Sequence, residues 1–146
     1  YVQWKSAMNP NPREKASYLK EYLQAVLNSG KLKFTENEEL GMKNIEIEFV
    51  YGHTESMMIC HIYKDKQTIS YVADLIPSHH HVRLPYIMAY DIRPMDTLQE
   101  KTIFLEKAFE NNHIIFFEHD KDVECCTLKR TEKGIEVDRL MKLEEI

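Results

Sequence analysis

The sequence predicts an α/β fold, and three patterns of apolar residues carry that prediction. Apolar residues recur at helical spacing between Leu19 and Leu27, whereas apolar and charged residues alternate between Ile45 and Phe49 as in a strand with one wet face. The segment from Ile114 to Phe117 is apolar at four successive positions, which is typical of a strand buried on both faces. A chain of 146 residues is long enough for one such mixed domain with one core.

The first predicted helix starts at Asn11. The run Asn11-Pro12-Arg13-Glu14 provides an N-cap, a proline at the first helical position and a glutamate three residues after the cap. Gly30 stands where a C-terminal cap is expected. We therefore expect an amphipathic helix of roughly four to five turns. Its apolar positions form one stripe that we expect to be buried: Leu19, Tyr22, Leu23, Val26 and Leu27.

Strands follow this helix. After the strand at 45–49, residues 51–54 form a turn, and residues 57–63 and 68–73 have the composition of two further strands. The polar residues between these two strands suit a tight hairpin connection. Asp74 follows directly on the second strand of this pair.

A long irregular segment and a second helix come next. Residues 75–96 contain three prolines and show no regular period, which indicates a long loop of the kind that is often functional. Residues 97–100 have the pattern of a capping box and predict the start of a helix that ends near Asn111. Three strands are predicted after it, with a turn at Lys133-Gly134 between the last two: 113–117, 123–128 and 135–137.

Composition excludes several classes of protein. The net charge is −5 and there is no cluster of Lys and Arg, so no nucleic-acid partner is expected. No stretch approaches the roughly 18 apolar residues of a membrane span, so no membrane association is expected. The cysteines number three, and Cys125 and Cys126 are adjacent and would point to opposite faces of a strand. A disulfide framework therefore has no support, the cysteines are read as structural, and a reducing, cytoplasmic setting fits best.

Three polar residues share one setting that favours a metal site. His53, Asp74 and His119 each stand just beyond the end of a predicted apolar strand, where α/β proteins commonly build sites from loops. Two imidazoles and a carboxylate suit zinc or another first-row dication, and the carboxylate is able to bridge two ions. Taken singly, each residue is more often a solvated loop residue or a hydrogen-bonding partner than a ligand. Spacing alone does not separate these interpretations.

The residues around these three positions carry a family resemblance. The segments concerned are Gly52-His53-Thr54-Glu55-Ser56-Met57-Met58, Val72-Ala73-Asp74-Leu75-Ile76-Pro77 and Phe116-Phe117-Glu118-His119-Asp120. They resemble the last three metal-binding motifs of metallo-β-lactamase-fold hydrolases, and the loop at 84–91 resembles one branch of that superfamily. The resemblance runs from about Asn9 to Cys126 and so covers most of the chain.

The resemblance implies a fold and a ligand set. The family's αββα sandwich consists of two similar halves, and residues 1–146 resemble only the C-terminal half, a mixed sheet with flanking helices. By the same implication His53 completes a first metal site, His119 completes a second, and Asp74 bridges both ions. The earlier family motif H-x-H-x-D-H is absent from this chain. An N-terminal half of the same protein is therefore the expected partner.

The implied activity depends on both halves. Two zinc ions, or other first-row dications, would hold a hydroxide that attacks a small-molecule ester, thioester or lactone. Catalytic zinc sites generally use three protein ligands plus a water. Here the first site would have only His53 and Asp74, and the second only His119 and Asp74. We therefore expect the isolated chain to hold metal weakly and to be catalytically inactive.

The loop between the second and third motifs supplies weaker candidates. Tyr86, Tyr90 and Asp91 are candidates for lining the substrate pocket or for donating a proton to the leaving group, although packing explains the tyrosines equally well. The adjacent histidines at 79–81 cannot all face one ion, so a solvated loop is expected there. The Glu-His-Asp context at 118–120 differs from the Gly-His context of thioesterase-type glyoxalases, which argues against that activity.

A second hypothesis belongs to another class of function. The chain could be a non-catalytic domain that keeps the fold and binds a partner protein. An isolated half-sandwich would expose an apolar face of several hundred Å² or more, which is typical of an association surface. Because the chain resembles only half of a domain, we expect it to dimerise, to aggregate or to co-purify with an N-terminal fragment when it is made alone.

Overall fold

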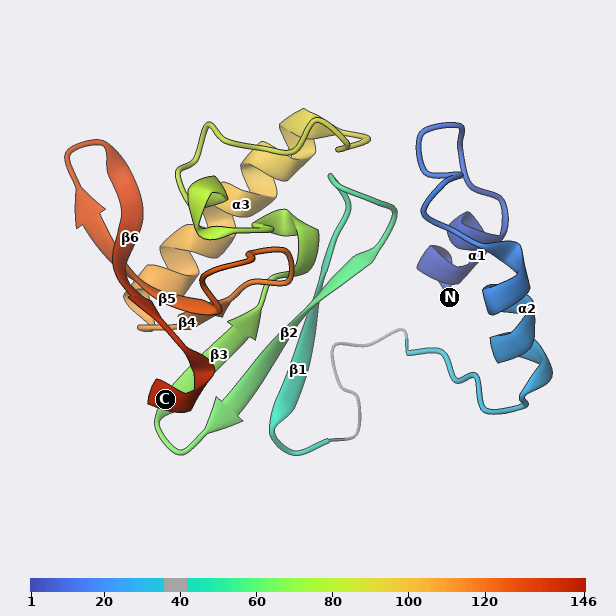
Figure 1. The fold of residues 1–146 in the computed structure, drawn as a ribbon, viewed down its shortest axis with the longest axis horizontal. Helices are drawn as coiled ribbons and strands as arrows, with labels where there is room; N and C mark the ends of the chain where they lie inside the picture. The colour runs from blue at the N-terminus through green and yellow to red at the C-terminus, as the bar shows by residue number, and fades with distance from the viewer. Residues whose placement is uncertain (36–41) are drawn as a thin grey trace.

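A computed structural model describes residues 1–35 and 42–146, and its centre is one mixed β-sheet (Figure 1). The strands are β1 (Ile45–Val50), β2 (Met57–Lys64), β3 (Gln67–Tyr71), β4 (Ile114–Phe116), β5 (Cys125–Thr131) and β6 (Gly134–Met141). They lie side by side in sequence order. Strands β3 and β4 pair in parallel, and all other neighbours pair antiparallel.

Helices flank this sheet. They are α1 (Val2–Met8), α2 (Lys20–Asn28) and α3 (Pro94–Glu110). Figure 1 shows α3 lying across one face of the sheet, whereas α1 and α2 lie beyond the β1 edge. The predicted α/β class, a mixed sheet with flanking helices, is therefore confirmed. Among the residues described, no helix is both long enough and apolar enough to cross a membrane.

The predicted strands all occur, with shifted ends. The strand predicted at 68–73 ends at Tyr71, because Ala73 has a φ of +45° and turns the chain into a short 3₁₀ turn, Ala73–Leu75. Asp74 lies in this turn rather than directly on the strand. Cys126 packs in the larger core cluster and Cys125 in the smaller one, so the two thiols face opposite sides of β5 as predicted.

The N-terminal helix differs from its prediction. The side chain of Asn11 does accept hydrogen bonds from the backbone N–H groups of Arg13 and Glu14, at 2.9 and 3.2 Å, but only irregular turns follow it. Helix α2 begins at Lys20, and α1 was not predicted at all. Asn11 thus makes the predicted N-cap hydrogen bonds, but no helix follows. Ser17 and Tyr18 are weak helix formers, and the chain does not continue as a helix through them.

The prediction that the apolar stripe between Leu19 and Leu27 is buried is wrong for this chain. No residue of α2 is buried, and the side chains of Leu19, Tyr22, Val26 and Leu27 are 44 to 67% exposed. We call these four residues the α2 stripe. Periodicity indicates that a helix has an apolar face, but it does not identify what covers that face.

Helix α3 begins three residues before the predicted capping box. Pro94 takes the first turn, so Thr97 lies inside the helix and is buried. The Glu100 carboxylate, predicted to cap the helix, instead accepts hydrogen bonds from the backbone N–H groups of Tyr51 and Gly52, at 2.7 and 3.0 Å. A Cβ on Gly52 would lie 2.2 Å from the Thr97 backbone nitrogen. The turn that precedes His53 is therefore packed directly against α3.

A buried polar network crosses the sheet beneath α3. The two ring nitrogens of His61 lie 2.9 Å from Ser70 Oγ and 3.2 Å from Glu48 Oε2. Ser70 Oγ also lies 2.9 Å from His113 Nδ1, and Lys107 Nζ donates to Glu48 at 3.0 Å. The hydrogen bond from His61 lowers the pKa of Glu48 to about 2. Because they are hydrogen-bonded, the buried members His61, Ser70 and His113 can lie in the core without a large cost in stability, while Glu48 and Lys107 extend the network to the surface.

Candidate metal centre

The structure brings the three predicted ligands together around one carboxylate. His53 Nε2 lies 3.3 Å from Asp74 Oδ2, and His119 Nε2 lies 3.2 Å from Asp74 Oδ1. Each oxygen of Asp74 thus faces one imidazole. The same carboxylate geometry would let Asp74 bridge two ions.

His53 is oriented by a carboxylate behind it. Its Nδ1 lies 2.8 Å from Oδ1 of Asp91, and this contact points Nε2 at Asp74. Burial lowers the pKa of His53, but the hydrogen bonds to Asp74 and Asp91 outweigh burial and raise it to about 9. Near neutral pH, His53 therefore carries a proton between two carboxylates, at the position where a cation would bind.

Asp74 is placed by the 3₁₀ turn after β3. The turn depends on the positive φ of Ala73, which is a small residue in a conformation that larger side chains rarely adopt. A hydrogen bond to His53 lowers the pKa of Asp74 despite its partial burial, so this carboxyl group is ionised. Asp74 therefore offers both of its oxygens as ligand atoms.

His119 is held by the loop in which it lies. Its backbone N–H donates to the carbonyl of Pro77 at 3.0 Å. The neighbouring Asp120 accepts hydrogen bonds from the backbone N–H groups of His79 and Val123, at 2.9 and 3.0 Å, and contacts the ring of His79. His79, one of the three adjacent histidines, therefore fastens the loop of His119 to the loop that follows Asp74.

Two of the three predicted pocket residues are exposed and have no described contact with this cluster. Tyr86 and Tyr90 are 52% and 72% exposed, and the described contacts join neither to His53, Asp74 or His119. Asp91 does reach the cluster, but it is buried behind His53 rather than exposed in a pocket. The sequence of the loop does not distinguish Asp91 from the two tyrosines. Which of these side chains is buried depends on how the loop packs against α3 and the turn at 51–54.

Sequence reasoning missed two residues near the centre. Lys101 of α3 is fully buried, and its Nζ donates to the backbone carbonyls of Arg83 and Tyr86, both at 2.8 Å, so it ties down the loop that leads to Asp91. Glu118 groups with Asp74 and His119, since one ligand atom from each lies within 4.8 Å of the others. A helical lysine gives no sequence signal for such a role. Glu118 adjoins His119 and could have been considered with it.

Comparison with solved structures shows that the chain has the fold of one half of a metallo-β-lactamase-type sandwich. A probable metal-dependent hydrolase from Staphylococcus aureus superposes with a TM-score of 0.81 at 23% identity, over 98% of this chain and 51% of the other. The dizinc quorum-quenching lactonase AidC gives 0.69 at 22% identity, over 93% and 48%. The hydrolase AbOPH of the β-lactamase superfamily gives 0.70 at 16%, over 95% and 52%.

These similarities establish the fold of the chain. It has the metallo-β-lactamase fold and spans about half the length of the structures that it matches, as expected for a C-terminal half. No family model matches the sequence, and no curated protein matches it. The predicted resemblance is thus confirmed in three dimensions.

Proposed function

We propose that this chain is the ligand-bearing C-terminal half of a dizinc hydrolase that acts on a small-molecule ester, thioester or lactone. The observation that carries the proposal is the Asp74 carboxylate, whose two oxygens each face an imidazole from a different loop. Similar folds in a metal-dependent hydrolase and a dizinc lactonase support it. Imidazole and carboxylate donors fit zinc and other first-row dications.

The residues of this chain would orient the donors for the reaction. When bound, divalent ions lower the pKa of a coordinated water and polarise the bond to be cleaved. Asp91 keeps Nε2 of His53 directed at the centre, and Asp120 keeps the loop of His119 in place. Such supporting carboxylates typically change metal affinity or activity by about 10- to 100-fold when removed.

A second half would complete the ligand set. Three protein ligands per ion are usual in catalytic zinc sites, and His53 with Asp74 supplies only two for the first site. We propose that an N-terminal half of the same protein supplies the rest, since the chain spans about half of the structures it matches. The isolated chain should then lack hydrolase activity.

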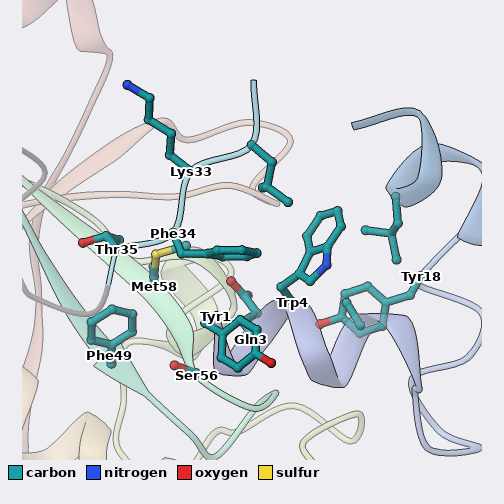
Figure 2. Close-up of a pocket in the computed structure, with 13 residues that line it drawn as sticks. Tyr1, Gln3, Trp4, Tyr18, Lys33, Phe34, Thr35, Phe49, Ser56 and Met58 are labelled. Carbon is teal, nitrogen blue, oxygen red and sulfur yellow. The ribbon is translucent and has the colours of Figure 1, made fainter. Parts of the chain in front are cut away.

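A pocket beside the centre favours a substrate with an apolar group. The cavity has a volume of about 360 Å³, and Figure 2 shows the rings of Trp4, Phe34 and Tyr18 around it. Tyr18 forms a hydrogen bond with Thr54, the residue after His53, and its pKa is raised by burial and by the charge of Asp74. Ser56 lines the pocket as well. These rings would hold the apolar group of an ester or lactone substrate.

The test is metal content and activity of the full-length gene product that contains this chain. We expect about two ions per chain by metal analysis, together with hydrolysis of an acyl lactone that His119→Ala abolishes. The matched control is His80→Ala, which removes an exposed imidazole nearby and should retain both ions and activity. Full-length protein that binds zinc but cleaves no ester, thioester or lactone would contradict the proposed activity.

The alternative function is a non-catalytic protein-interaction module, and one observation favours it. The α2 stripe is apolar and exposed, as an association surface would be. Full-length protein that binds no metal, together with a soluble and monodisperse 146-residue chain, would favour this alternative over the hydrolase.

A further inference from the structure

We propose that Glu118 is a third protein ligand, which together with Asp74 and His119 lets this chain by itself hold one divalent cation. This inference rests on the proposed metal centre and goes beyond it. The ligand set implied by the family resemblance takes only His53, Asp74 and His119 from this half.

The distances suit a single ion. Nε2 of His119 lies 3.2 Å from Asp74 Oδ1 and 4.0 Å from Glu118 Oε1, and the ligand atoms of all three residues lie within 4.8 Å of one another. A tetrahedral ion with bonds of about 2.1 Å holds its ligands about 3.4 Å apart. Side-chain shifts of about an ångström would therefore bring the three donors to bonding distance.

Charge around Glu118 favours a cation. The two oxygens of Asp74 already face imidazole nitrogens, since Oδ2 lies 3.3 Å from His53 Nε2 and Oδ1 lies 3.2 Å from His119 Nε2. Among the residues described, Glu118 has no Lys or Arg within ion-pair distance, and its one ion-pair contact is His119 at 4.0 Å. A dication among the three residues would supply the positive partner that the Glu118 carboxylate lacks.

Glu118 lies two residues after the end of β4. Phe116, the last residue of β4, packs on Tyr71 of β3 with ring centroids 5.9 Å apart, and the backbone N–H of Phe117 donates to the carbonyl of Glu124 at 2.9 Å. Glu118 and His119 are themselves exposed, which leaves the remaining coordination positions open to water or to other ligands.

The expected consequence is that the second site has three donors in this half alone. The count of two ligands per site, on which the expectation of weak binding rested, then applies only to the site of His53. The isolated chain should bind one ion rather than none.

The experiment is a calorimetric titration of the metal-free 146-residue chain with Zn²⁺, with Co²⁺ absorption as a second readout. We expect one ion per chain, at least tenfold weaker binding for Glu118→Gln, loss of binding for His119→Ala, and one retained ion for His53→Ala. Glu118→His replaces the carboxylate with another zinc donor and should bind within tenfold of the unchanged chain. The matched control, Glu132→Gln in the exposed turn after β5, should bind like the unchanged chain.

The outcomes separate this inference from the proposed function. If Glu118→Gln binds like the unchanged chain while His119→Ala does not bind, Glu118 is no ligand although the metal centre stands. If the unchanged chain binds no ion but the full-length protein binds two, the inference fails and the proposed function survives. Circular dichroism of each variant excludes unfolding as the cause of lost binding.

Discussion

At the scale of single residues, the centre depends on how His53 is held. Its imidazole lies between Asp74 and the buried Asp91, and it is protonated near neutral pH because its pKa is raised to about 9. A histidine with a raised pKa stabilises the folded state fully below its unfolded pKa of about 6.5. That contribution is lost as the pH rises through about 9, unless an ion replaces the proton.

Asp91→Asn should lower the pKa of His53 in the metal-free chain from about 9 toward its ordinary value of 6.5, because one of the two carboxylates that stabilise the imidazolium becomes neutral. An NMR titration of the histidine side chains measures this shift. Asp138→Asn on the exposed part of β6 makes the same chemical change and should leave His53 as it was. An unchanged pKa in Asp91→Asn would show that Asp74 alone holds the proton.

At the scale of secondary-structure elements, the buried network joins β1, β2 and β3 to the start of β4. Burial, together with the charges of His61 and Lys107, lowers the pKa of His113 to about 4. Between about pH 6.5 and 4 the unfolded chain therefore binds a proton at this position that the folded chain does not. The folded state should lose stability as the pH falls through this window.

His113→Asn should remove part of this acid sensitivity. The asparagine amide can still bond Ser70, while the titrating group is gone. The loss of unfolding free energy between pH 6.5 and 4 should shrink by on the order of 1–3 kcal/mol, measured by urea denaturation at several pH values. His80→Asn changes an exposed histidine and serves as the control. Parallel pH profiles for unchanged chain and His113→Asn would contradict the assignment.

Elements also show what the sequence could and could not predict. The strands were predictable because side chains alternate between the two faces of a strand. One exposed face gives the alternation between Ile45 and Phe49, and two buried faces give the continuous apolar run at 114–117. The start of α3 was not predictable. The Glu100 carboxylate could cap its own helix or accept hydrogen bonds from another segment, and only the fold shows that it bonds the backbone at 51–52. Local sequence describes a side chain's chemistry but not its distant partner.

The same limit applies to the centre. His53, Asp74 and His119 were predictable because each follows shortly after a strand, in a segment that resembles a known motif, and the structure brings them together. The place of Asp91 behind His53 was not predictable, since 38 residues separate the two and only the fold brings them together. Glutamates occur in many exposed loops, so the residue type of Glu118 does not indicate a ligand. Only its short distance from Asp74 and His119 distinguishes it.

At the scale of the whole molecule, the exposed α2 stripe governs how the chain should behave in solution. Leu19, Tyr22, Val26 and Leu27 form an apolar face on a helix at the edge of the fold. We expect the 146-residue chain to self-associate with rising concentration in sedimentation velocity, because association removes this face from water.

Val26→Lys should shift that equilibrium toward monomer by placing a charge within the stripe. The control, Ile103→Lys, changes an exposed apolar residue of α3 that lies outside the stripe and should leave association unchanged. A chain that stays monomeric without substitution would contradict a role for the stripe in association.

The close contact at Gly52 has a dynamic consequence. The amide hydrogens of Tyr51 and Gly52 are bonded to Glu100 of α3, and Gly52 has no room for even a methyl group against Thr97. These two amides exchange their hydrogens with deuterated water once the Glu100 carboxylate releases them, and Gly52 is in addition buried against Thr97. The Gly52 amide should therefore exchange more slowly than the amide of an exposed surface loop.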